Sequence, residues 1–165
     1  MGGYADYIGL EQLLSLQRPR TGKVSTELVF IVAHQVYELW FKIIIADLES
    51  AITAVDRGDV NAALRPLRRI RELERLMTEQ LVLLEHLDPY EFAEIRGALN
   101  TASAAESYQF ARIEALSTSH LPTDLQFRPV RDLWTAFCEL MERSGLEMPQ
   151  EATDAAARTR VASVH

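Results

Sequence analysis

The stretch from Phe30 to Lys42 constrains the fold of this chain most, because it is rich in apolar and aromatic residues yet carries a histidine in its middle. Steps of three and four residues return to the same face of a helix. One such face carries Phe30, His34, Tyr37, Phe41, Ile44 and Leu48. A second, polar face carries Gln35, Glu38, Lys42 and Glu49. The spacing therefore predicts one long helix that turns His34 toward the interior of the protein.

The histidine in this stretch has two physical interpretations. In the first, His34 is a core residue whose two ring nitrogens are satisfied by neighbouring polar groups. In the second, its ring faces a cavity that another molecule fills, as a histidine does when it takes part in binding or catalysis. The pattern of residues alone leaves both interpretations open.

The composition bounds the class of protein and argues against some partners. With 165 residues, 48% of them hydrophobic and 25% charged, the chain can bury a core and is neither disordered nor fibrous. Its net charge of −7 argues against nucleic acid or an anionic membrane as a main partner. We expect one helical domain over residues 1–150 and a frayed tail over residues 151–165.

The lone cysteine, Cys138, excludes an internal disulfide and forms no C-x-x-C motif, so we expect it in the apolar core.

The N-terminus has no basic region followed by an apolar run, which predicts no secretion signal and a cytoplasmic location. The apolar run from Leu28 to Ile45 is interrupted at helical spacing by polar residues, among them His34 and Lys42. This favours a buried helix with one polar edge over a membrane span.

Periodicity and helix breakers predict an all-α fold, a bundle of about five helices built around the His34 helix. Ser25 or Thr26 offers an N-cap for that helix, which we expect to end near Val55, ahead of Gly58. A second long helix, capped by Asp59, should run to His86, with Pro66 as either a kink or its true start. Other helices are expected over residues 90–99 and 130–143 and from residue 104, and residues 4–16 are expected to form a short helix or turn.

Several segments resemble the tryptophan 2,3-dioxygenase family. The run Phe30–Lys42 resembles the helix that carries the distal-pocket histidine of that family. The other segments are Tyr4–Leu14, Leu87–Arg96, Ala102–Ser103 and Ser107–Phe110. All of them occur along this chain in the same order as in the family. Together they span residues 4 to 114, with a weaker similarity near residues 146–150. The resemblance implies the helical fold of the N-terminal part of this family.

The resemblance also implies an activity and a site. Members of the family use haem and O₂ to cleave the C2–C3 bond of the tryptophan indole, which gives N-formylkynurenine and begins the kynurenine pathway of tryptophan catabolism. By resemblance, His34 would be catalytic and bond the indole N–H, and Arg96 would hold the α-carboxylate of tryptophan or a related aromatic amino acid. Phe30 and Phe92 would line the pocket, and Ser103 would lie beside haem and substrate.

In the family, the N-terminal segment reaches into the neighbouring subunit and helps to close its substrate pocket. By resemblance, Tyr4, Tyr7 and Ile8 would do this here, which implies a homo-oligomer with exchanged N-terminal segments.

The chain departs from the family pattern at two places. After Ser103 the family shows Gly-Phe-Gln, whereas this chain has Ala104-Ala105-Glu106. After Gln-Phe the family shows an arginine directly, whereas Ala111 precedes Arg112 here. We expect the loss of a phenylalanine to enlarge or reshape the pocket.

The iron ligand is the largest departure. The family holds its haem with a histidine from a long C-terminal helical region, and no segment here resembles that region, so we expect a short form. The candidate ligands are His86, His120 and His165, the three histidines other than the distal His34. Two alternatives remain open. The chain could bind an aromatic amino acid without catalysis, or a second chain could supply the ligand of a two-chain haem enzyme.

Overall fold

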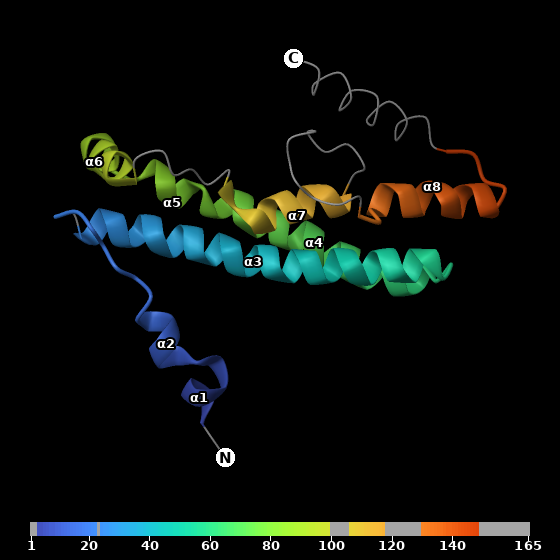
Figure 1. Cartoon of the computed structure of the whole chain (residues 1–165), viewed down its shortest axis with the longest axis horizontal. Coiled ribbons are helices and arrows are strands. Elements are labelled where there is room, and N and C mark those ends of the chain that lie inside the picture. The colour runs from blue at the N-terminus through green and yellow to red at the C-terminus, as the bar shows by residue number, and fades with distance from the viewer. Residues whose placement is uncertain (1–2, 23, 100–105, 118–129, 149–165) are drawn as a thin grey trace. The chain divides into compact units, whose positions relative to one another are not determined.

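The computed structural model describes residues 3–22, 24–99, 106–117 and 130–148, and every long element in these ranges is a helix. The predicted all-α fold is thus confirmed (Figure 1). The helices of the described residues are α1 (Tyr4–Ile8), α2 (Leu10–Leu14), α3 (Val24–Asp56), α4 (Val60–Gln80), α5 (Val82–Glu85), α6 (Pro89–Leu99), α7 (Tyr108–Ser117) and α8 (Leu133–Arg143).

The chain divides into two compact units. The first consists of Met1–Leu39 and Leu76–Ala104, and the second of Trp40–Arg75 and Ala105–His165. Helices α3 and α4 each contribute one part to either unit. That residues 1–150 form a single domain stays a prediction.

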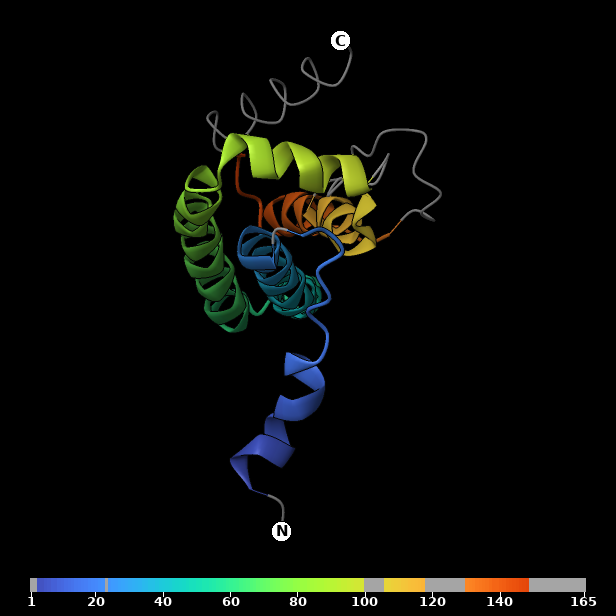
Figure 2. The ribbon, with the colours of Figure 1, turned by 90° about the vertical axis from the view of Figure 1, so that its left-hand side faces the viewer.

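In the first unit, α6 lies across the N-terminal part of α3 (Figure 2). Ala33 of α3 and Ile95 of α6 are buried in this unit, at 3% and 1% exposed. The end of α4 joins α3 through the Tyr37 hydroxyl, which donates to the carbonyl oxygen of Met77 at 2.6 Å. These contacts set the position of α6 beside the turn of α3 that carries His34.

The start of α3 differs from the prediction. The helix begins at Val24, so Ser25 and Thr26 lie inside it and the predicted N-cap at either residue is wrong. The Thr26 hydroxyl instead donates to a carboxylate oxygen of Glu91 in α6. A hydroxyl in the first turn therefore ties two helices together instead of capping one.

Glu27, which is 5% exposed, holds the loop before α3. Its carboxylate accepts the backbone N–H groups of Arg20 at 2.8 Å and Thr21 at 2.7 Å, and the Thr21 hydroxyl at 2.8 Å. Burial alone would raise the pKa of the Glu27 carboxyl, but these hydrogen bonds outweigh burial and lower it below the usual 4.5. The ionised form of Glu27 therefore stabilises the loop.

The second unit has the larger apolar core. From α3 it takes Ile44 and Leu48, as predicted, and also Ala51, Ile52 and Val55. The other buried apolar residues of this unit come from α4, α7 and α8, and include Ala63, Ile70, Leu73, Ala111, Ala115, Leu116 and Ala136. Five of these residues are alanines, whose small side chains allow helices to approach closely.

Helix boundaries in the second unit follow the predicted breakers in part. Gly58 adopts a left-handed conformation, with φ of 74°, and ends α3 as expected. The Asp59 carboxylate accepts the N–H of Ala62 at 2.9 Å, which confirms its role as N-cap of α4. Pro66 neither starts nor ends α4, because the helix continues through it with Pro66 buried.

Two other predicted boundaries are wrong. The second long helix does not run to His86, because α4 ends at Gln80, ahead of Leu81, which is 49% exposed. The final described helix starts at Leu133 and not at residue 130, because the buried Asp132 caps it by accepting the Thr135 N–H at 2.9 Å.

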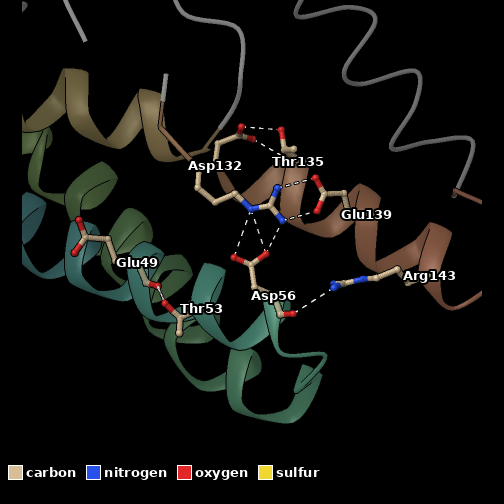
Figure 3. Close-up of polar contacts among 8 residues, drawn as sticks. Glu49, Thr53, Asp56, Asp132, Thr135, Glu139 and Arg143 are labelled. Carbon is tan, nitrogen blue, oxygen red and sulfur yellow. Dashed lines mark hydrogen bonds and ion pairs between the residues drawn. The ribbon is translucent and has the colours of Figure 1, made fainter. Parts of the chain in front are cut away.

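Ion pairs join helices within the second unit, and their carboxylates are buried or half-buried. Asp47 of α3 is 3% exposed and accepts two hydrogen bonds from the guanidinium of Arg69 in α4. Figure 3 shows Asp56 and Glu139 facing one guanidinium, which belongs to Arg131. Arg131 donates to Glu139 at 2.8 and 2.7 Å, and these bonds lower the pKa of the Glu139 carboxyl. The end of α3 is thereby joined to α8.

The surface of α3 is more exposed than the sequence predicts. Within Ser25–Asp56, a window of 18 residues has a mean hydropathy of 1.6, and 11% of this window is buried. By length and composition alone it could cross a membrane, a criterion that core helices of soluble proteins also meet. Apolar side chains of α3 that are exposed include Leu28, Val29, Val32, Leu39 and Ile43.

Replacing Glu27 by glutamine should loosen the loop before α3 at neutral pH. Because the pKa of Glu27 is lower in the folded than in the unfolded chain, its stabilisation is present above the unfolded pKa and is lost as pH falls through the folded value. Amide exchange of residues 18–22 should be faster in Glu27→Gln than in the wild type at pH 7, and the difference should shrink below about pH 4.5.

Glu94→Gln is the matched control, because Glu94 is an exposed residue of α6 in the same unit. It should leave the exchange of residues 18–22 unchanged. A difference between Glu27→Gln and the wild type that stays constant from pH 7 to pH 3 would contradict the assignment.

Candidate functional site

A groove in the first unit brings together four of the residues singled out in the sequence. Its volume is about 720 Å³, and its walls come from the first part of α3, from α6 and from the segment between α4 and α6. The lining residues are Phe30, Ile31, His34, Gln35, Leu84, Leu87, Pro89, Phe92, Arg96 and Leu99. The walls are thus mainly apolar, with three polar side chains.

His34 takes its orientation from the turn of α3 that precedes it. Its Nδ1 lies 2.8 Å from the carbonyl oxygen of Phe30, and its ring centroid lies 4.1 Å from that of Phe30. A carbonyl oxygen only accepts, so Nδ1 carries the proton of the neutral ring and Nε2 carries a lone pair. The two interpretations of His34 therefore combine, since one nitrogen is satisfied within the helix while the ring lines the groove.

Phe92 and Arg96 lie one helical turn apart on α6, and both line the groove. The start of α6 is fixed by Asp88, whose carboxylate accepts the N–H groups of Tyr90 at 2.9 Å and Glu91 at 3.1 Å. The Phe92 ring lies 6.0 Å from that of Phe30, with the ring planes at 52°. This aromatic contact joins the two walls of the groove.

The chemistry of these walls suits one class of ligand. Two aromatic rings and several aliphatic side chains favour a flat apolar group. His34 offers a hydrogen-bond acceptor, and Arg96 offers a planar cation that pairs well with a carboxylate. An aromatic compound with both an N–H group and a carboxylate would satisfy every part of this set.

The predicted N-terminal pocket residues do not lie in this groove. Tyr4, Tyr7 and Ile8 belong to α1 and are 76%, 89% and 37% exposed. Gly9, with φ of 61°, separates α1 from α2, so the predicted helix over residues 4–16 is broken in two. Ser103 lies outside the described residues.

Gln35 is a groove residue that the sequence pattern does not identify. Helical periodicity places it on the polar face of α3, yet it lines the groove beside His34. Its position directly after His34 was the available signal, since consecutive residues on a helix point about 100° apart and both can border one opening. Of the residues that depart from the family pattern, Ala111 is buried in the second unit and Arg112 pairs with Glu49 at 3.1 Å.

Among the described residues, one histidine lines the groove. His34 is the only histidine among the groove residues, and the part of the chain that is described holds no group of three or more metal-ligating side chains. His86 is exposed at the end of α5 and is not among the residues that line the groove. His120 and His165 lie outside the described ranges. No histidine of these ranges faces His34 across the groove, so no axial ligand is assigned.

Comparison with known proteins identifies the family. The family model described as tryptophan 2,3-dioxygenase matches residues 1–135. A protein named tryptophan 2,3-dioxygenase from Herpetosiphon aurantiacus is 34% identical over 162 residues, which cover 90% of this chain and 62% of the relative. One of that name from Rhodococcus jostii is 31% identical, with coverage of 92% and 58%. One from Kineococcus radiotolerans is 38% identical, with coverage of 67% and 39%.

The chain thus spans less than two thirds of the length of these relatives, between 39% and 62%. The family model, however, covers most of its 165 residues, including the whole groove. This chain belongs to the tryptophan 2,3-dioxygenase family.

Proposed function

We propose that this chain takes part in the oxidative opening of the indole ring of tryptophan, and that the groove between α3 and α6 is its tryptophan site. In this reaction both atoms of O₂ are inserted across the indole C2–C3 bond, and the product is N-formylkynurenine. The observation that supports the proposal is the meeting of Phe30, His34, Phe92 and Arg96 in one groove of a chain of this family.

In the proposed complex the indole ring lies against Phe30 and Phe92, and its N–H donates to Nε2 of His34. The Nδ1–H···O contact to Phe30 supports this arrangement, because it leaves the lone pair on Nε2. A histidine held in this tautomer orients the indole ring and so presents its C2–C3 bond in one direction.

Arg96 is the proposed partner of the α-carboxylate. It is exposed at the groove, one turn of α6 beyond Phe92, so a carboxylate can reach it while the aromatic ring occupies the apolar part. A planar guanidinium can donate two parallel hydrogen bonds, which fixes the direction of the amino acid as well as binding its charge.

The partners and cofactor of the reaction are part of the same proposal. Tyr4, Tyr7 and Ile8 are exposed on α1, which supports a role in closing the groove of a neighbouring copy in a cytoplasmic homo-oligomer. Ser103 is proposed to lie beside the substrate. Activation of O₂ is the chemistry of haem, and the iron ligand would come from outside the described residues or from another chain.

Replacing Arg96 by leucine should weaken tryptophan binding by about tenfold or more, because a charge-assisted pair with the carboxylate is lost. Tryptamine has the same indole and amine but lacks the carboxylate. Its affinity should therefore be nearly the same for the wild type and Arg96→Leu. Titration calorimetry of the haem-free protein with both compounds measures this. Equal losses of affinity for both compounds would contradict a carboxylate role and indicate a damaged groove.

Replacing His34 by phenylalanine should weaken tryptophan binding by about fivefold, the contribution of one neutral hydrogen bond. In 1-methyltryptophan the indole N–H is replaced by N–CH₃, so this compound cannot donate to Nε2. The wild type should prefer tryptophan over 1-methyltryptophan, and His34→Phe should lose that preference. A preference that survives the substitution would remove His34 from the proposed contact.

Turnover requires a separate experiment on the protein supplied with haemin, a reductant, tryptophan and isotopically labelled O₂. The proposal expects N-formylkynurenine that carries both labelled oxygen atoms, and a loss of its formation in Arg96→Leu at low tryptophan concentration. If the protein binds tryptophan in the calorimeter but forms no product under these conditions, this chain by itself is a binding protein, and the proposed reaction would require an iron ligand from another chain.

A further inference from the structure

The N-terminal segment formed by α1 and α2 has little apolar attachment of its own. Neither helix contains a buried residue, and Leu14 and Leu16 are 67% and 56% exposed. Without apolar burial, the direction in which a short segment projects depends on its polar contacts. Such contacts are found at the end of α2, at Gln17, and in the following loop, at Arg20 and Thr21.

Gln17 joins the end of α2 to α3 through both hydrogens of its side-chain amide. One hydrogen of Nε2 is donated to the carbonyl oxygen of Leu13 at 3.0 Å, which satisfies a carbonyl at the C-terminus of α2. The other is donated to Oε1 of Gln35 in α3. Gln35 in turn donates a longer hydrogen bond from its Nε2 to the carbonyl oxygen of Leu16, at 3.4 Å. The pair therefore holds the last turn of α2 and the next residues against one side chain of α3.

The position of Gln35 gives this contact a second property. Gln35 lines the groove and directly follows His34, whereas Gln17 is not among the lining residues. One carboxamide is thus both part of the groove wall and the acceptor that holds the N-terminal segment. Both glutamines are partly exposed, so neither is locked in place by surrounding core.

We propose that Gln17 and Gln35 are positioning residues that couple occupancy of the groove to the order of α1 and α2. A ligand that packs on the groove wall restricts the rotamers of Gln35 and keeps Oε1 in place for Gln17. The N-terminal segment is then held more firmly. By thermodynamic reciprocity, a firmly held segment favours ligand binding to the same degree. The coupling to tryptophan rests on the proposed function, whereas the anchoring of the segment does not.

The test compares Gln17→Ala with Gln12→Ala, a matched control in the same segment whose side chain makes no hydrogen bond among the described residues to α3. Amide exchange of residues 10–17 is measured with and without tryptophan, and tryptophan affinity is measured by calorimetry. In the wild type and in Gln12→Ala, tryptophan should slow this exchange. In Gln17→Ala, exchange should be faster without ligand, the effect of tryptophan on it should vanish, and affinity should fall about fivefold.

A double-mutant cycle separates this role from a merely structural one. In the Gln35→Ala background, the further change Gln17→Ala should leave tryptophan affinity unchanged, because the contact between the two side chains is already broken. Its effect on exchange should then be limited to the loss of the hydrogen bond from Gln17 to the Leu13 carbonyl oxygen. Wild-type-like exchange of Gln17→Ala without ligand would overturn the anchoring. Faster exchange together with unchanged affinity would overturn the coupling. If the wild type binds no tryptophan, the proposed function fails and the coupling fails with it, and the exchange measured without ligand still decides the anchoring.

Discussion

A single helix of 33 residues, α3, supplies side chains to both units, so its periodicity determines what each unit can contain. In its second part, the buried apolar positions are filled by aliphatic residues and alanines. In its first part, the equivalent face carries Phe30 and His34, and these are only partly buried. The same helical repeat therefore makes a core in one unit and a groove wall in the other.

The hydrogen bond from Nδ1 of His34 to the carbonyl oxygen of Phe30 makes the helical repeat determine the tautomer of the His34 ring. The donor and acceptor are four residues apart, so the geometry of the helix itself holds the ring. No side chain from another element is needed to select the tautomer. Consequently the acceptor on Nε2 depends on α3 alone, whereas the aromatic and cationic parts of the groove depend on how α6 is held by Asp88, Thr26 and Ile95.

The sequence was informative wherever one helix repeat decided the outcome. Spacing alone placed Ile44 and Leu48 on the inward face of a long helix, and both residues are buried in the structure. It failed where a distant partner decided the outcome. Thr26 has the chemistry of an N-cap, but Glu91, far away in the sequence, takes its hydroxyl instead. Local propensity cannot anticipate such a partner.

Gln35 shows the same limit in the site. Periodicity places it on the polar face of α3, which is correct for the isolated helix. Only the folded chain brings Gln17 and the groove to the same side chain. The residues proposed to recognise a ligand lie in two stretches of the first unit, residues 30–35 and 84–99, and none of them is a candidate iron ligand. The proposed binding of an indole amino acid can for this reason be measured separately from the proposed oxygen chemistry.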